Sequence, residues 1–297
     1  MLIKKIKNIS MIRRFLQAQN GKILATFIQN SFIYKAMQKS VGDVWYPFYV
    51  IKWKIASLLV RRKTVSIEGV RFTLPCNNWI THFRWYLFNN KEVEVRSFID
   101  KHLKDGDVFF DIGANIGVFS IYAGKKYDNL KVYSFEPEYS NLALLKQNII
   151  QNQLQDTVLP YSLAISDTVG LSHLYLQDID EGAAAHTEST DAIEITDEGY
   201  KVVGAEGIFT VTLDYIVGEL DVIPSCIKMD TDGNELKIIE GAKKTLANPK
   251  LHALVIEMPD EDKRDKCAAI LSSFGFMPEW VHPELTRNEV WLRQGIK

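Results

Sequence analysis

Cysteine is scarce in this chain of 297 residues, which contains Cys76, Cys226 and Cys267, all far apart in the sequence. No C-x-x-C pair and no cluster of histidines accompanies them. The spacing therefore indicates neither a disulfide framework nor a structural zinc site. We expect a protein of a reducing compartment, the cytoplasm.

Long hydrophobic runs are also missing. The most apolar stretch, Val44 to Val60, is interrupted by Pro47, Lys52 and Lys54. A membrane-spanning helix needs about 20 consecutive apolar residues, and a signal peptide needs an apolar segment directly after its basic start. The sequence predicts neither.

Charge is distributed unevenly. Residues 1–63 hold 13 Lys or Arg and one acid, Asp43, whereas the remainder holds 22 basic and 36 acidic residues. The end of this basic head is also rich in aromatic residues, namely Trp45, Tyr46, Phe48, Tyr49 and Trp53. This composition suits peripheral contact with an anionic bilayer, at the inner face of the membrane. The alternative is a helical head that packs on the rest of the chain or forms a homodimer. Nucleic-acid binding is not expected, because the body is acidic and carries no nucleic-acid motif.

Three regions follow from the residue pattern. Residues 1–64 form a basic helical N-terminal region. Residues 65–104 form a β-hairpin and a helical lead-in, in which Glu68-Gly69 is the tight turn between Val65–Ile67 and Val70–Leu74. Residues 105–297 form the main domain, and residues 166–225 within it break the regular pattern. So long an insertion is either a lid over the substrate or disordered.

The main domain alternates short apolar runs with helical patterns. Strands are predicted at Val108–Ile112, Val132–Phe135, Val158–Ile165, Cys226–Met229 and Leu254–Ile256, and helices at Val118–Lys125, Ser140–Asn152, Asn234–Leu246 and Asp262–Phe274. Such alternation predicts an α/β fold with a doubly wound, mostly parallel sheet. Pro278–His282 and Asn288–Arg293 predict a terminal hairpin that adds one antiparallel strand.

A glycine-rich turn follows the first predicted strand, with the sequence Asp111-Ile112-Gly113-Ala114-Asn115-Ile116-Gly117. A dinucleotide site needs G-x-G-x-x-G, with the pyrophosphate at the helix N-terminus. Here Asn115 stands where the second glycine is required. The Asp111 carboxylate would repel a pyrophosphate but suits the ammonium and sulfonium charges of S-adenosylmethionine. The turn therefore favours the methyl donor over a nucleotide-dependent oxidoreductase.

A second acid, Glu136, ends the next predicted strand and is followed by Pro137. From that position a carboxylate can accept hydrogen bonds from both hydroxyls of a ribose. The alternative is that Asp111 and Glu136 cap the helices that follow them and that the glycines serve packing. Two acids at equivalent strand ends, flanking the glycine-rich turn, favour the cofactor interpretation.

Several short sequence blocks, read in order, resemble the FkbM family of methyltransferases, and the similarity covers residues 92–293. They are, in order, Asp111 to Gly117, Phe135-Glu136-Pro137, Asn148 with Asn152, Ala164 to Asp167, Thr212-Leu213-Asp214, Ile227 to Glu235, Glu240-Gly241-Ala242 and Ile256-Glu257. The chain departs from the family pattern at Asp232, where glutamate is more frequent, and at Asn234, where an aromatic residue is.

The resemblance implies a Rossmann-like class I methyltransferase fold and transfer of a methyl group from S-adenosylmethionine to oxygen, often a hydroxyl of a sugar, glycan or glycosylated small molecule. It places the adenine beside Ala164 and Ile165. The residues expected to bind the cofactor are Asp111, Gly113, Ala114, Asn115, Gly117, Glu136, Pro137, Ala164, Ile165 and Asp230. A different interpretation is a non-catalytic adaptor that tethers a partner through its basic head.

Methyl transfer requires alignment of an acceptor oxygen and removal of its proton. Asp230, directly after a strand, is the first candidate for the base or for an anchor of the methionine moiety. His186 and Glu257 are further catalytic candidates, and His282 is a weaker one. Lys228 lies on the same side of its strand as Asp230 and is a candidate ion-pair partner. Glu257, Asp230 and Asp232 offer oxygen ligands for Mg²⁺, but acids gather at strand ends for many reasons, and no required metal is predicted.

Overall fold

The computed structural model describes residues 62–75, 78, 80–81, 84, 88, 93–184, 186–189, 202–258, 261–281 and 288–295. The predicted basic head, with its membrane and dimer interpretations, lies outside these residues, as does His282. Among the helices in the described ranges, none combines the length and apolarity that crossing a membrane requires.

The predicted hairpin is present as β1 (Arg62–Ile67) and β2 (Val70–Pro75), which pair antiparallel. Its turn residues Glu68 and Gly69 have φ angles of 49° and 83°, the left-handed conformation that a two-residue hairpin turn needs. Phe72 and Leu74 of β2 are buried in the hydrophobic core. The hairpin is therefore part of the main packing unit.

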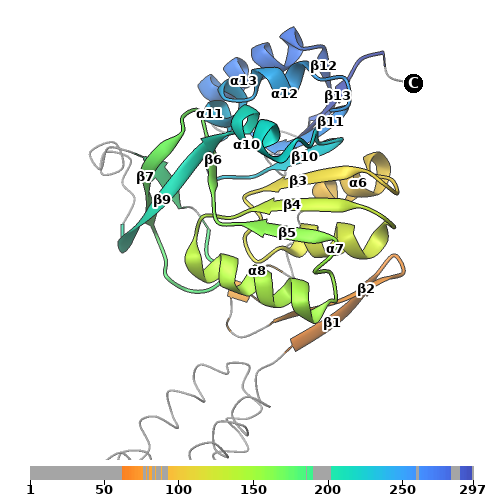
Figure 1. Cartoon of the computed structure of the whole chain (residues 1–297), viewed down its shortest axis with the longest axis vertical. Coiled ribbons are helices and arrows are strands. Elements are labelled where there is room, and N and C mark those ends of the chain that lie inside the picture. The colour runs from red at the N-terminus through yellow and green to blue at the C-terminus, as the bar shows by residue number, and fades with distance from the viewer. Residues whose placement is uncertain are drawn as a thin grey trace, which may run out of the picture.

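A seven-stranded sheet in the order β12-β13-β11-β10-β3-β4-β5 forms the centre of the molecule (Figure 1). Its strands are β3 (Val108–Ile112), β4 (Lys131–Phe135), β5 (Val158–Tyr161), β10 (Cys226–Met229), β11 (Ala253–Glu257), β12 (Phe276–Val281) and β13 (Asn288–Arg293). Of these seven strands, β13 alone runs opposite to the others. The α/β class, the mostly parallel sheet and the terminal hairpin are confirmed. The chain order reverses between β3 and β10, and ligands of open α/β sheets bind at the carboxyl edge of such a switch point.

Helices cover both faces of this sheet because side chains of successive strand residues alternate between two cores. Phe109 points into a core shared with α6 (Val93–His102), α7 (Val118–Lys126) and α8 (Tyr139–Gln151). Phe110 points into the other core, shared with α10 (Leu213–Leu220), α11 (Glu235–Glu240), α12 (Lys243–Ala247) and α13 (Glu261–Ser273).

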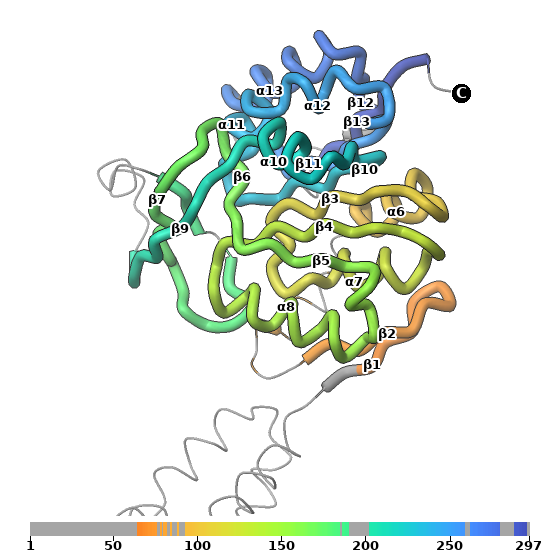
Figure 2. The backbone as a smooth tube through the Cα atoms, viewed as in Figure 1, coloured from red at the N-terminus to blue at the C-terminus, as the bar shows by residue number. Residues whose placement is uncertain are grey.

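A second sheet of four strands, in the order β6-β9-β7-β8, lies beyond one end of the central sheet (Figure 2). It comprises β6 (Ala164–Ser166), β7 (Gly170–Leu176), β8 (Thr187–Ser189) and β9 (Gly204–Thr212). The prediction of one strand over residues 158–165 was wrong. The run divides into β5 of the central sheet and β6 of the second sheet. Both pieces contain buried apolar residues, so hydrophobicity alone does not separate them.

Two further corrections concern helices. Helix α10 was not predicted, although Thr212 caps it by accepting a 3.1 Å hydrogen bond from the Tyr215 amide. The predicted helix over residues 234–246 is divided into α11 and α12 at Gly241. A Cβ there would lie 2.6 Å from the carbonyl oxygen of Ser166, so the chain packs against β6 only where no side chain intervenes.

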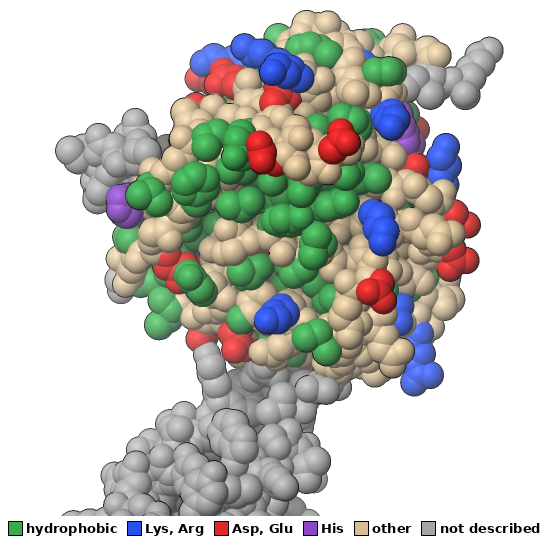
Figure 3. Space-filling view, in the orientation of Figure 1, with side chains coloured by type: hydrophobic (Ala, Val, Ile, Leu, Met, Phe, Trp, Pro, Cys, Tyr) green, Lys and Arg blue, Asp and Glu red, His purple; other side chains and the backbone are tan. Residues whose placement is uncertain are grey.

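Hydrophobic side chains gather on the face drawn in Figure 3, over β4, β5 and α10. Tyr133 and Tyr161 stack there with ring centroids 6.2 Å apart, and Leu159 and Tyr215 are exposed. After β5 the chain enters β6 directly, with no intervening helix to cover this side of the strands.

Candidate active site

A pocket opens at the carboxyl edge of the central sheet, where the strand order reverses. Its walls include Ile112 and Phe135 at the ends of β3 and β4, Asp230 after β10, and Ala164 of the second sheet. Residues 183, 184, 186 and 188, from the insertion, complete it. The candidate site therefore lies between the two sheets, at the position where the fold favours a ligand.

The glycine-rich turn is packed tightly beneath this pocket. Gly113, Asn115 and Gly117 have φ angles of 72°, 50° and 82°. A Cβ at Gly113 would lie 1.8 Å from the carbonyl oxygen of Asp230, and one at Gly117 would lie 2.2 Å from Leu145 Cδ1. Both glycines therefore allow close packing, of the turn on the loop after β10 and on α8.

Every amide of the turn donates its hydrogen bond within the protein. The amides of Gly113 and Ala114 donate to Phe135 O (3.0 Å each), that of Asn115 to Glu136 Oε2 (2.7 Å), that of Ile116 to Asn115 Oδ1 (2.9 Å) and that of Gly117 to Ala114 O (2.8 Å). A pyrophosphate site needs such amides to be available to the ligand. This geometry disfavours a dinucleotide and fits a cofactor without phosphate.

Asp111 is fully buried on the face of β3 that packs under α7, and it is not part of the pocket wall. Its Oδ2 accepts a 2.5 Å hydrogen bond from Ser120 Oγ, and its Oδ1 lies 3.2 Å from Lys228 Nζ. Lys228 Nζ also donates to Gly113 O at 2.7 Å and lies 3.6 Å from Asp230 Oδ2. The structure therefore links Asp111 to the pocket through Lys228, which is an ion-pair partner of both acids.

Glu136 lines the pocket with its carboxylate nearly buried. Its two oxygens accept hydrogen bonds from the amides of Asn115 (2.7 Å) and Glu138 (2.9 Å). Burial raises the pKa of Glu136 to about 7, although these two amides oppose the shift. A carboxylate oxygen accepts more than one hydrogen bond, so each retains capacity for a ribose hydroxyl. Pro137, Ala164 and Ile165 lie on the same wall.

Residues 181–184 are fixed over the pocket by asparagine side chains. Asn115 Nδ2 and Asn141 Nδ2 donate to Ala183 O at 2.7 and 3.1 Å, and Asn141 Oδ1 accepts from the Gly182 amide at 2.8 Å. The side chain of Asn115 therefore holds this roof, and its backbone holds Glu136. Asn141 was missed in the sequence, where nothing distinguishes it within an amphipathic helix.

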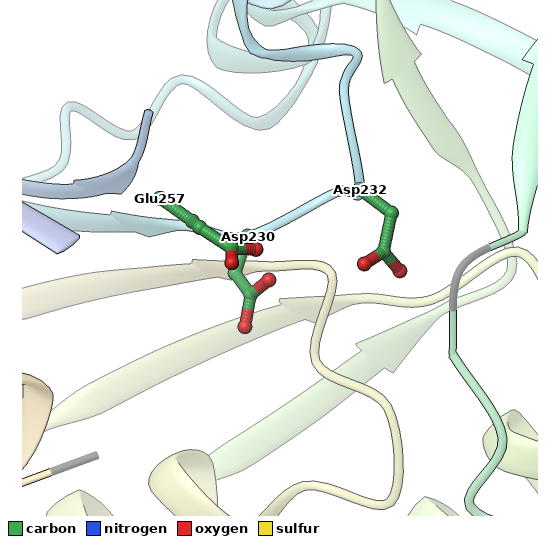
Figure 4. Close-up of side chains that lie close together, drawn as sticks. All are labelled: Asp230, Asp232 and Glu257. Carbon is green, nitrogen blue, oxygen red and sulfur yellow. The ribbon is translucent and has the colours of Figure 1, made fainter. Parts of the chain in front are cut away.

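Three carboxylates meet at the edge of the pocket, with one oxygen of each within 4.8 Å of the others. Figure 4 shows Asp230 and Glu257 side by side and Asp232 projecting from the loop after β10. Burial, followed by the Asp230 charge, raises the pKa of Glu257 to about 9. Burial acts to raise the pKa of Asp230 too, but Lys228 and a hydrogen bond with Glu257 outweigh it and lower that pKa. Asp230 is therefore ionised and Glu257 protonated at neutral pH; the same oxygens are also of the type that binds Mg²⁺.

His186 lines the pocket, and neither of its ring nitrogens has a hydrogen-bond partner among the residues that the structure describes. Burial lowers its pKa, so the imidazole is neutral at pH 7. A neutral imidazole nitrogen can accept a proton. Both properties are those of a general base.

Arg84 also lines the pocket and was not identified from the sequence. It falls in the stretch interpreted only as a helical lead-in, and no motif surrounds it. Asp232 and Asn234, the two departures from the family pattern, both lie on the pocket wall. Asn234 Nδ2 donates to Ile165 O at 3.1 Å, which ties the loop after β10 to the second sheet.

Comparison with known proteins gives consistent matches. A family model described as the methyltransferase FkbM domain matches residues 111–287. The 31-O-demethyl-FK506 methyltransferase FkbM of Streptomyces tacrolimicus is 25% identical over 199 residues, which cover 59% of this chain and 74% of that protein. The hexuronic acid methyltransferase AglP of Haloferax volcanii is 26% identical over 186 residues, covering 61% and 68%. A crystal structure of methyltransferase FkbM from Methylobacillus flagellatus gives a TM-score of 0.41 at 16% identity, covering 64% of this chain and 44% of that one.

Proposed function

The chain belongs to the FkbM family of S-adenosylmethionine-dependent methyltransferases, and on this basis we propose that it methylates a hydroxyl oxygen of a sugar or glycan. The family and the type of enzyme predicted from the sequence are confirmed. The acceptor class is the proposed part. The name of the first relative, a 31-O-demethyl-FK506 methyltransferase, supports an oxygen acceptor. The name of the second, a hexuronic acid methyltransferase, supports a sugar.

The single observation that carries the proposal is that one pocket combines a cofactor wall with a histidine whose ring nitrogens have no hydrogen-bond partner among the described residues. Glu136 presents two carboxylate oxygens to a ribose, and Ala164 and Ile165 present an apolar surface suited to an adenine. His186 lines the same pocket. When bound, the cofactor supplies an electrophilic methyl group on sulfur.

The task of the protein is to align the acceptor and to remove its proton. With the cofactor bound, formation of the O–CH₃ bond and cleavage of the S–CH₃ bond would release the hydroxyl proton, and a ring nitrogen of His186 would accept it. Glu257 is protonated at neutral pH and cannot accept it. Asp230 is ionised, but its lowered pKa makes it a weak base. We therefore assign Asp230 to orienting the acceptor or the methionine ammonium group, and the base to His186.

The test combines cofactor binding with turnover. Calorimetric titration of the wild type should show saturable binding of S-adenosylmethionine and S-adenosylhomocysteine but not of NAD⁺. Transfer of a radiolabelled methyl group to hexuronate- or hexose-containing glycans should then fall by about 10²- to 10⁴-fold in His186→Gln, with S-adenosylhomocysteine affinity retained. Wild-type turnover by His186→Gln would remove it as the base, and absence of nucleoside binding by the folded wild type would overturn the cofactor site.

A further inference from the structure

Arg84 is a cation on a pocket wall whose other charged side chains are acidic. Four carboxylate side chains line the pocket, those of Glu136, Glu188, Asp230 and Asp232. Among the described residues of the wall, Arg84 is the one Lys or Arg. A single guanidinium in this setting either neutralises one of these acids or serves a ligand.

Two of these acids pair with lysines. Glu188 pairs with Lys237 at 3.2 Å and Asp230 with Lys228 at 3.6 Å. Within the described part of the chain, Arg84 forms no ion pair, and its hydrogen bond is the one from Nε to Gly182 O, at 2.8 Å. Among the described residues, Arg84 therefore makes no direct pair with the carboxylates of the wall.

The contact with Gly182 also orients the guanidinium. The Gly182 amide is held by Asn141 Oδ1 at 2.8 Å, so the acceptor of the Arg84 bond belongs to the fixed roof of the pocket. With Nε committed, the two terminal nitrogens remain as a planar pair of donors, the arrangement that matches the two oxygens of a carboxylate. The charge of Arg84 reaches both Asp230 and His186, since it contributes to lowering the pKa of each.

We propose that Arg84 binds a carboxylate group of a ligand in this pocket. This inference rests on the proposed function and specifies its ligand chemistry. The carboxylate belongs either to the methionine moiety of the cofactor or to an acidic acceptor such as a uronic acid. A phosphate group carries nearly two negative charges and would be repelled more strongly by the four acids of the wall.

The experiment compares ligands that differ by the carboxylate. Wild type, Arg84→Gln and Arg84→Lys are titrated calorimetrically with S-adenosylhomocysteine and with 5′-methylthioadenosine, which lacks the amino-acid moiety. Each protein, saturated with S-adenosylhomocysteine, is then titrated with glucuronate and with glucose. Arg71→Gln is the matched control, because Arg71 is exposed on β2 and is not part of the pocket wall.

If the carboxylate is that of the cofactor, Arg84→Gln weakens S-adenosylhomocysteine binding by at least ~10-fold and leaves methylthioadenosine unchanged. If it is that of the acceptor, glucuronate binding is lost while both nucleosides and glucose bind as to the wild type. Arg84→Lys should fall between, because it keeps the charge without the paired donors. Wild-type binding of both carboxylate ligands by Arg84→Gln overturns the inference but leaves the proposed function intact. That function fails separately, if the wild type binds neither nucleoside. Methylthioadenosine binding also reports folding, and if Arg84→Gln does not fold, the comparison passes to Arg84→Lys.

Discussion

Lys228 and Asp111 form an ion pair inside the protein, with Nζ and Oδ1 3.2 Å apart and side chains that are 3% and 0% exposed. The two residues are register partners on the adjacent parallel strands β10 and β3. Because Lys228 Nζ also donates to Gly113 O, the pair fixes the position of the glycine-rich turn beneath the pocket. A change in either buried charge therefore affects both the stability of the sheet and the geometry of the site.

We expect Lys228→Met to lower the free energy of unfolding by about 3–5 kcal/mol, because removal of one partner leaves the Asp111 charge buried and uncompensated. Urea denaturation measures this loss. The double variant Asp111→Asn/Lys228→Met should recover much of it, since neither charge then remains. A single variant as stable as the wild type would contradict a stabilising ion pair at this position.

Gly113→Ala should weaken S-adenosylhomocysteine binding by more than ~10-fold, since the new Cβ would lie 1.8 Å from a backbone oxygen of Asp230 and the turn must move. Gly69→Ala is the matched control. Gly69 has a similar positive φ of 83°, but nothing lies within 4 Å of its Cβ position, so this variant carries the backbone strain of about 1–2 kcal/mol without the collision. Calorimetric affinities that fall equally in both variants would show that strain, rather than contact with Asp230, matters.

Glu136 should couple cofactor binding to pH. Burial raises its pKa to about 7 in the free protein, and two ribose hydroxyls that donate to it would favour the ionised form. Binding near pH 7 should therefore release up to about half a proton, because the group is then about half protonated, and affinity should fall as the pH drops below 7. Calorimetry in two buffers of different ionisation enthalpy measures the released proton. Glu136→Gln should abolish the release, and tighter binding by the wild type in acid would contradict a ribose contact.

The central parallel strands β3, β10 and β11 could be predicted because each is buried on both faces and forms a continuous apolar run. The same property concealed the boundary between β5 and β6, where an apolar run continues although the chain changes sheets. The division of the helix at Gly241 could not be predicted for a similar reason. A side chain is excluded at Gly241 by the backbone of Ser166, which is distant in the sequence.

The strand-end acids of the site could be predicted for the same reason, since parallel strands end at one edge. The direction of each side chain could not. Asp111 is one residue before the end of β3, and the alternation of the strand turns it under α7. Arg84 and Asn141 reach the pocket only through tertiary packing, and no local pattern marks them.

The cluster of Asp230, Asp232 and Glu257 raises the question whether methyl transfer needs a metal ion. With a proton shared between Asp230 and Glu257, methyl transfer should survive EDTA and gain nothing from Mg²⁺. Asp232→Asn, at the exposed member of the cluster, should then leave turnover equally independent of Mg²⁺, because no metal ligand is lost. Loss of activity in EDTA that Mg²⁺ restores would instead assign these oxygens to a divalent cation.

The acid limb of the pH profile should identify the base. Burial lowers the pKa of His186 from 6.5, so kcat/KM for the acceptor, measured with saturating cofactor, should fall with decreasing pH below that value as the imidazole becomes protonated. Stopped assays with the same acceptor over pH 5 to 8 measure this limb. In Asp230→Asn the limb should persist at reduced rate, whereas in His186→Gln the residual activity should lose it. A limb that survives in His186→Gln and disappears in Asp230→Asn would transfer the role to Asp230, and the neutral imidazole would then serve only to position the acceptor hydroxyl.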